Sequence, residues 1–401
     1  MSNATSTIET RRELTAYVHD VMVGSKTRWE QSQKHRFGEG RAKAYLLDVH
    51  QPDDDIQRGV QRLFGTAAES VQGQVAETKD AGLYKLYVGN EILFLDAADP
   101  RFVVVHTTGY ARSTDRIMRS MVEASPAIDR AWLPSPFLVS TARNIGRVRR
   151  RTISFDSYAF WTGKASRSDD IWEDAEEIEP EGHGVPIGKE FSLDFRDRMR
   201  NTTAIEQLYA IPDFADAMSF SRVDISRRLE GQDGYSVARI YNWGKLSGVG
   251  TSAELHFGIV NNLRNAYRFA LERIERDFRF SVDLAERQSS IPHLHGHPVS
   301  ITFPTPIPDL ALFAKRIFAG RRPFMLWGIP QTRGEGYVTV QALDLHVNRL
   351  IYCELMPKGV RVYLKADSCA NSVARLYANL LMYYDARAQL WGKGEVDALL
   401  Q

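Results

Sequence analysis

Cysteine is scarce in this chain, and its scarcity excludes two structural classes. The 401 residues include two cysteines, Cys353 and Cys369. Two thiols close at most one disulfide, so the chain is neither a disulfide scaffold nor a protein built on a four-sulfur metal site. We therefore expect a reducing compartment and place the protein in the cytoplasm.

Long apolar runs and an excess of one charge are also lacking. No segment approaches the about 18 consecutive apolar residues that span a membrane, and we expect neither a signal peptide nor a membrane partner. Fifty-one basic residues against 50 acidic ones leave a net charge of +1. With no global field, any contact with nucleic acid must come from a local patch.

What the chain does contain is ordinary globular composition, 43% hydrophobic and 25% charged, in which strands and helices come in blocks. The first eighty residues predict mainly helices, as in the spacing of Leu14, Val18 and Met22. Strands are predicted over 83–88, 92–95, 102–106, 235–243, 337–343, 350–355 and 360–364, with helices over 113–124, over 255–274 and from an Asn371 N-cap onward. This order favours an α+β fold, with a helical N-terminal preface followed by antiparallel β-meanders that are each packed by a helix.

Acidic residues concentrate between Asp169 and Glu181. Such a density of carboxylates resists burial, so this stretch predicts a solvated loop or linker. We expect an N-terminal domain of helices and one meander over 1–165, an acidic loop or linker over 166–190, and a C-terminal α+β domain over 191–401.

Three of the ten histidines, His293, His295 and His297, lie within five residues. If the chain continues into Val299 as one strand, the three imidazoles share the apolar face and line a pocket. There they could hold a transition-metal ion, or His297 could act as a catalytic nucleophile. The alternative is a loop whose histidines are partly exposed or hydrogen-bonded to backbone carbonyls.

The spacing of these histidines is similar to the His-x-His-x-His motif of the histidine-triad nucleotide hydrolases and transferases. The resemblance is confined to residues 292–298. It implies a phosphoester or nucleotide hydrolase in which His297 attacks a phosphate. Gly296 and Pro298 depart from the motif, whose intervening positions are apolar strand residues, because glycine and proline interrupt a strand.

A second cluster joins basic and aromatic residues. Its members are Arg143, Arg147, Arg149, Arg150 and Arg151, followed by Tyr158 and Trp161. Guanidinium groups neutralise phosphates and aromatic faces stack on bases, which is the combination found in single-stranded nucleic-acid sites. The alternative is a solvated edge whose charge is met by the acidic stretch.

The glycine-rich segment 244–252 fits neither a Walker A loop nor a dinucleotide-binding loop. We expect a flexible turn there, with Thr251 or Ser252 as the N-cap of a helix.

Because no complete catalytic motif accompanies the arginine cluster, we expect a non-catalytic nucleic-acid-binding or assembly component of a larger intracellular complex, without a cofactor. Two alternatives stay open. One is a hydrolase that uses His293, His295 and His297 directly or through one transition-metal ion. The other is a scaffold that binds protein partners.

Overall fold

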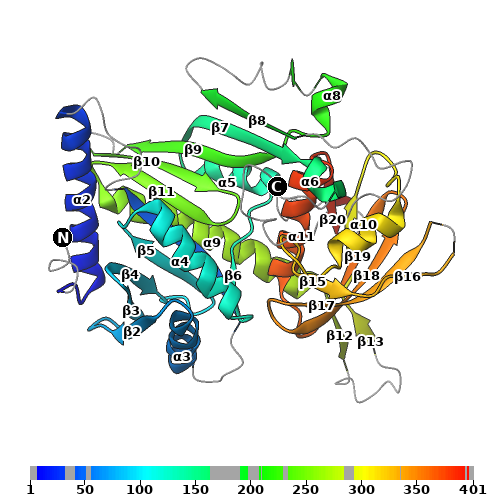
Figure 1. The fold of residues 1–401 in the computed structure, drawn as a ribbon, viewed down its shortest axis with the longest axis horizontal. Coiled ribbons are helices and arrows are strands. Elements are labelled where there is room, and N and C mark those ends of the chain that lie inside the picture. Colours follow the sequence, from blue (N-terminus) through cyan, green and yellow to red (C-terminus); the bar gives the residue numbers. More distant parts are fainter. Residues whose placement is uncertain are drawn as a thin grey trace. The chain divides into compact units, whose positions relative to one another are not determined.

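The structure is a computed structural model, and it describes residues 7–31, 41–50, 56–162, 190–196, 207–208, 210–228, 234–283, 293–334, 336–392 and 395–396. The chain divides into two compact units (Figure 1). Unit 1 comprises 1–131, 141–149 and 222–268, and unit 2 comprises 132–140, 150–221 and 269–401. The predicted linker 166–190 lies outside the described residues except for Glu190. Among the described helices, none combines the length and apolarity that a membrane crossing requires.

Unit 1 is built on a mainly antiparallel sheet flanked by helices, which confirms the α+β class. Its strands follow the order β2-β3-β4-β5-β1-β11-β10-β9, and β6 pairs with β1. The strands are β1 (Ala42–Val49), β2 (Gly73–Glu77), β3 (Leu83–Val88), β4 (Glu91–Asp96), β5 (Phe102–Thr107), β6 (Ile128–Arg130), β9 (Phe220–Arg228), β10 (Tyr235–Tyr241) and β11 (Lys245–Gly250). The helices are α2 (Arg11–Gln31), α3 (Ile56–Glu69), α4 (Ala111–Ala124), α5 (Ser135–Ile145) and α9 (Ala253–Phe278). The first half of α5 and the end of α9 are assigned to unit 2.

Helices cover both faces of the predicted meander β3-β4-β5. On one face, α3 and α4 bury Phe64 and Met121 against Leu86 and Val103. On the other face, α2 buries Val18 against Phe94, together with the start of α9. The N-terminal preface is helical at α2 and α3, but it also contributes β1, a central strand of the sheet.

The glycine-rich segment forms a strand rather than the predicted flexible turn. Residues Lys245–Gly250 are β11, which pairs with both β10 and β1. A Cβ atom at Gly248 would lie 2.3 Å from Nδ1 of His256, so glycine at this position lets α9 pack closely on the sheet. Ser252 is the N-cap, as predicted, because its hydroxyl accepts a hydrogen bond from the backbone N–H of Leu255 at 3.2 Å.

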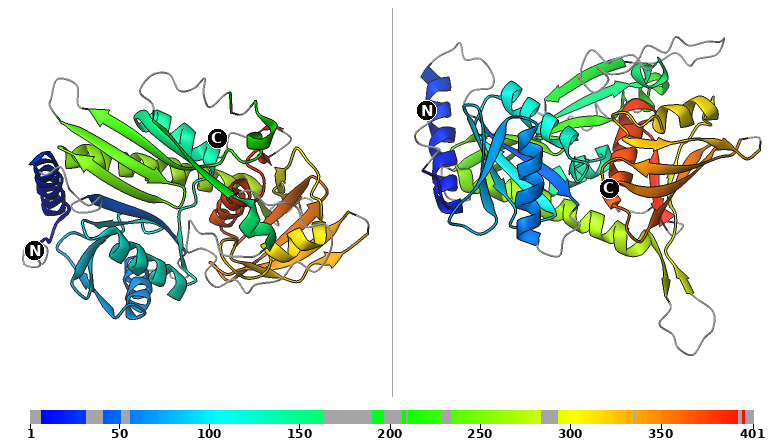
Figure 2. Two further views of the ribbon diagram at one scale, coloured as in Figure 1. Left: turned by 45° about the horizontal axis from the view of Figure 1, so that its top comes forward. Right: turned by 60° about the horizontal axis from the view of Figure 1, so that its bottom comes forward.

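Unit 2 contains a second sheet, with strands in the order β15-β17-β18-β19-β14-β20-β21 and with β12, β13 and β16 paired beside them. The strands of this sheet are β12 (Arg279–Asp283), β13 (His293–His295), β14 (Val299–Thr302), β15 (Leu326–Gly328), β16 (Gln331–Thr332), β17 (Val338–Asp344), β18 (Arg349–Met356), β19 (Gly359–Lys365), β20 (Gln389–Gly392) and β21 (Glu395–Val396). Unit 2 also contains β7 (Arg147–Asp156, from Arg150 on) and β8 (Glu190–Arg196), which pair with each other outside this sheet. The helices are α6 (Ser157–Thr162), α8 (Pro212–Ala215), α10 (Leu310–Ile317) and α11 (Ala370–Tyr383). The paired strands β12 and β13 extend away from this sheet (Figure 2).

The three predicted strands β17, β18 and β19 and the helix α11 after them are confirmed. Every residue of α11 is buried. Cys369 is its N-cap residue, so the predicted N-cap Asn371 already lies inside the first turn. Beside α11, the rings of Phe160, Phe303, Phe313 and Tyr384 form an aromatic core, with ring centroids 4.7 to 5.9 Å apart in the pairs that touch.

A buried ion pair joins α11 to β17. Arg375 and Asp344 have fully buried side chains, and Nη2 of the arginine lies 2.5 Å from Oδ1 of the aspartate. Arg375 also donates to the carbonyl oxygen of Phe324 at 2.8 Å, and the hydroxyl of Ser372 donates to the second carboxylate oxygen. With both charges hydrogen-bonded, the pair fixes the position of the helix on the sheet at a tolerable desolvation cost.

We predict that Asp344→Ala lowers the free energy of unfolding by about 3 to 5 kcal/mol, because it leaves the Arg375 charge buried without its carboxylate. Urea unfolding followed by circular dichroism measures the change. The control is Asp367→Ala, which breaks the exposed pair Arg349–Asp367 and should cost less than about 1 kcal/mol. Equal costs for the two variants would contradict the prediction.

Candidate nucleic-acid interface

One face of the unit 1 sheet is lined by polar side chains from four adjacent strands. Cross-strand register places Lys43 opposite Ser247, Tyr45 opposite Lys245, and Arg239 opposite both Ser247 and Asp224. Residues that face each other across two strands point to the same side of the sheet. We call this side of the sheet the polar face. It comprises Lys43, Tyr45, Arg222, Asp224, Arg239, Tyr241, Lys245 and Ser247, bordered by Arg41, Asp115, Arg130 and Trp243. Its members on β1 and β11 and Asp224 are buried, whereas Arg222, Arg239 and Tyr241 are partly exposed.

The alternate residues of the same strands form the apolar side of the sheet. Ile225, Ala238, Ile240 and Leu246 all have 0% of their surface exposed. Their burial fixes which residues of β9, β10 and β11 can reach the polar face. The polar face is therefore a consequence of core packing.

Lys245 lies at the centre of the polar face. Its ammonium donates to both oxygens of Asp115, at 2.6 and 2.5 Å. The hydroxyl of Tyr45 donates to Oδ1 of the same carboxylate at 2.6 Å and lies 2.9 Å from Oγ1 of Thr114. Burial, with the Asp115 charge next in weight, raises the pKa of Tyr45 well above its usual range, so the phenol stays protonated and can donate.

Aromatic rings surround the same ammonium group. Nζ of Lys245 lies 5.7, 5.5 and 5.3 Å from the ring centroids of Tyr45, Tyr241 and Trp243. The guanidinium of Arg130 lies 5.1 Å from the Trp243 ring. Trp243 precedes Gly244, which has a φ of +78° and no room for a side chain, because a Cβ would lie 2.8 Å from the carbonyl oxygen of Ala131. This close turn aims the indole at the polar face.

Lys43 is the most buried cation of the polar face. Its surface is 2% exposed, and its ammonium donates to the carbonyl oxygen of Arg41 at 3.2 Å and to that of Gly109. Burial lowers the pKa of Lys43 to about 8, and the neighbouring charge of Lys245 adds to the shift. The ammonium group of Lys43 therefore loses its proton near pH 8.

Arginines occupy the β9–β10 part of the face. Arg239 donates to Asp224 at 3.2 Å, and Nε of Arg222 lies 3.5 Å from the same carboxylate. The side chains of Arg222 and Arg239 are 19% and 25% exposed. In all, six basic side chains lie near the carboxylates of Asp115, Asp224 and Glu91. They are those of Arg41, Lys43, Arg130, Arg222, Arg239 and Lys245. This excess of cations, with donors held in fixed positions, suits an anionic ligand such as a phosphate.

The arginines that the sequence groups together lie at the end of α5 and along one strand, β7. Arg143 on α5 and Arg147 and Arg149 at the start of β7 are exposed residues of unit 1. Arg150 and Arg151 belong to unit 2, where Arg150 forms an ion pair with Asp194.

Of the two predicted stacking rings, the structure describes that of Trp161. Trp161 is 4% exposed, and its ring packs against Phe160 and Tyr384 with centroids 5.0 and 5.7 Å away. This ring therefore belongs to the core of unit 2. The side chain of Tyr158 lies outside the described residues.

The histidine tract lies partly on β13, which holds His293 and His295, and partly in the segment after it, which holds His297. β13 ends at His295 and β14 begins at Val299, and Gly296 between them has a φ of +102°. The continuous strand face that would align three imidazoles with Val299 is therefore not formed. His295 and His297 are exposed, whereas the side chain of His293 lies outside the described residues. Metal binding by the tract stays a prediction.

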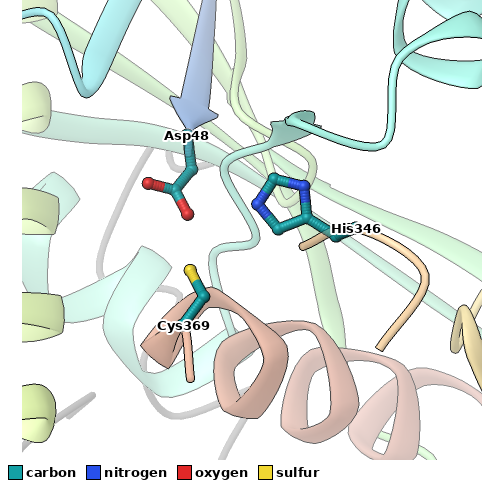
Figure 3. Close-up of side chains that lie close together, drawn as sticks. All are labelled: Asp48, His346 and Cys369. Atoms are coloured by element: carbon teal, nitrogen blue, oxygen red, sulfur yellow. The ribbon is translucent and has the colours of Figure 1, made fainter. Parts of the chain in front are cut away.

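A thiol and an imidazole that the sequence did not single out meet in unit 2. The sulfur of Cys369 and a ring nitrogen of His346 lie within 4.8 Å of each other (Figure 3). Both residues are buried, and Asp344 accepts a hydrogen bond from the backbone N–H of His346 at 2.9 Å. Asp48, also drawn in Figure 3, belongs to unit 1, where it accepts a hydrogen bond from Arg101 at 3.0 Å. Because 22 residues separate His346 from Cys369, no local motif could signal their proximity.

Fold and site together define an α+β protein with a basic face on its first sheet. A family model described as MJECL33-like protein matches residues 2–399, so the chain belongs to the MJECL33-like protein family. The chain is also similar to "Uncharacterized protein MJECL33" of Methanocaldococcus jannaschii, with 24% identity over 340 residues. That alignment covers 79% of this chain and 80% of the archaeal protein, so the similarity extends over most of both.

We predict that Lys43→Met flattens the pH dependence of stability between pH 8 and about 10.5, where the unfolded chain keeps a proton that the folded protein has released. In the wild type this difference makes stability rise with pH across that window. The contribution amounts to at most about 3 kcal/mol. Urea unfolding at a series of pH values measures it, with the exposed Lys358→Met as control. Parallel curves for wild type and Lys43→Met would contradict the prediction.

Proposed function

We propose that the protein binds nucleic acid and that the polar face of unit 1 contacts the phosphates. The observation that carries the proposal is the convergence of four partly exposed arginines with the rings of Tyr241 and Trp243 around the buried Lys43 and Lys245. The arginines are Arg41, Arg130, Arg222 and Arg239. Cations neutralise the backbone charge of a nucleic acid, and rings beside them can accept bases. These features support nucleic-acid binding, the role predicted from the sequence. In this proposal the main contacts come from the polar face rather than from the arginine cluster.

The extent of the polar face supports a polymeric anion. The face spans four neighbouring strands, β9, β10, β11 and β1. Strands lie about 4.8 Å apart, so the face is about 14 Å wide, which exceeds one phosphate group. Arg147 and Arg149, both exposed, are retained as further phosphate contacts of unit 1. In this proposal the protein serves as a binding component of a larger intracellular complex.

We predict that wild-type protein binds fluorescent oligonucleotides with an affinity that falls steeply as salt rises. The double variant Arg222→Gln/Arg239→Gln should reduce the slope of log K against log salt by about 1 for each lost phosphate contact. Fluorescence anisotropy with single- and double-stranded DNA and RNA measures both quantities. Arg147→Glu/Arg149→Glu, tested beside it, measures the contribution of the exposed arginines.

The matched control is Arg276→Gln, which removes a charge from an arginine side chain of α9 that is 68% exposed. It should leave both the affinity and the salt slope within error of the wild type. Absence of wild-type binding at low salt would refute the proposal, and an equal loss in the control would show that only overall charge matters.

The hydrolase alternative keeps one structural observation in its favour, because His295 and His297 are exposed and therefore accessible to a metal ion or a phosphate. It predicts stoichiometric binding of Zn²⁺ or Co²⁺, measured by metal analysis after dialysis, and loss of that metal in His295→Ala/His297→Ala. If the wild type holds no metal, or if the variant holds as much as the wild type, the metal-dependent hydrolase is refuted. If His297→Ala leaves phosphoester hydrolysis by the folded protein unchanged, a hydrolase with His297 as nucleophile is refuted as well.

A further inference from the structure

The second sheet carries a cluster of aromatic and apolar residues on one face. On the other face, Asp344 of β17 bonds to Ser372 and Arg375 of α11, and its neighbours in the alternation, including Val340, Ile351 and Cys353, are buried. The remaining residues of the strands point away from α11. We call this side the aromatic face, and it comprises Phe280, Trp327, Leu343, Leu350, Tyr352 and Tyr363.

Cross-strand pairing brings these residues into neighbouring positions. Trp327 of β15 lies opposite Leu343, which lies opposite Leu350. Tyr352 lies opposite Tyr363, and their ring centroids are 5.4 Å apart. The ring of Phe280 on β12 follows at 5.5 Å from Tyr363. The rings of Tyr352, Tyr363 and Phe280 therefore form a continuous row across three strands.

Several apolar and aromatic side chains of the aromatic face are exposed to solvent. Trp327 is 53% exposed and Leu350 is 39% exposed, while Phe280, Tyr352 and Tyr363 keep part of their surface accessible. Solvent-facing sides of antiparallel sheets normally carry polar residues. A cluster of exposed apolar and aromatic side chains costs hydration free energy and marks a surface that a ligand covers.

Charge on the same face favours an anionic ligand. Arg361 and Lys365 of β19 are exposed there, and Arg333 hydrogen-bonds to Thr339 of β17 at 3.4 Å. The carboxylate of Glu354 accepts a hydrogen bond from the hydroxyl of Tyr363 at 2.8 Å and lies 3.8 Å from Arg361. Among the residues that the structure describes here, three basic side chains surround the one engaged carboxylate of Glu354, which favours an anionic ligand.

We propose that the aromatic face binds a single-stranded nucleic acid by stacking its bases on the rings of Trp327, Tyr352 and Tyr363. This inference rests on the proposed function and specifies its substrate class. Bases of a single strand can unstack and lie on protein rings, whereas bases in a duplex are already paired and stacked. The basic side chains beside the rings hold the phosphates of the same strand. Protein interfaces also use aromatic residues and arginine, so a protein partner on this face is an outcome of the test.

The test compares ring removal with ring retention in the full-length chain. Trp327→Leu/Tyr352→Leu removes two rings and keeps apolar side chains, whereas Trp327→Phe/Tyr352→Phe keeps both rings. Phe269→Leu, which removes a 66% exposed ring on α9, controls for exposed aromatics in general. Binding of single-stranded and duplex oligonucleotides is measured by anisotropy across a salt series, after circular dichroism has shown that each variant is folded.

We expect Trp327→Leu/Tyr352→Leu to lose about 5- to 100-fold in single-strand affinity for each stacked base, with the salt slope unchanged, because stacking is not electrostatic. The Phe variant and Phe269→Leu should bind as the wild type does, and duplex should bind more weakly than single strand. As a direct check, an oligonucleotide with 5-iodouracil should crosslink under ultraviolet light to peptides that contain Trp327, Tyr352 or Tyr363.

The outcomes separate this inference from the proposed function. Binding that responds to Arg222→Gln/Arg239→Gln but not to the Leu variant overturns the stacking surface alone and leaves the face to a protein partner. Duplex bound as tightly as single strand also overturns it. Absence of any nucleic-acid binding by the wild type overturns both.

Discussion

Alternation of side chains along a strand is the constraint on which both proposed surfaces depend. In β10, Ala238 and Ile240 point into the core while Arg239 and Tyr241 point the other way. A slip of one residue in register would bury a guanidinium and a phenol and expose two core residues. Apolar packing against α9 thus holds the polar face in place, and packing against α11 does the same for the aromatic face. The packing of the buried side chains therefore determines which residues lie on the polar face and on the aromatic face.

The buried charges of the two units are handled in different ways. Arg375 and Asp344 are fully buried together and bonded to each other, so their charges serve to position a helix. Lys43 is almost as buried, but its ammonium faces two carbonyl oxygens and a neighbouring Lys245, and its pKa falls accordingly. A lysine kept in such surroundings costs stability.

Local signals made the regular parts of the fold predictable. The meander β3-β4-β5 and the group β17-β18-β19-α11 have short turns and clear periodicity, so the sequence places them within a few residues. β1 was not predicted as a strand, because all eight of its residues are buried and it lacks the alternation of buried and exposed residues that marks a strand. β11 was not predicted as a strand, because its glycines are typical of a loop. In the structure Gly248 allows His256 to pack closely. Local sequence patterns could not predict the polar face, because its side chains come from strands as far apart in the chain as β1 and β11.

The pairing of β1 with β11 also orders events during synthesis. About 200 residues separate the two strands, which is about 10 to 40 s of translation at usual rates. Until β11 emerges, the edge of β1 that it will cover presents unpaired backbone groups to other nascent chains. Neither unit is contiguous in sequence, because unit 1 needs residues up to 268 and unit 2 begins at 132. The chain therefore completes its first unit only after residues 132–140 and 150–221 of the second have been made, and until then β1 keeps an edge to which another chain can pair.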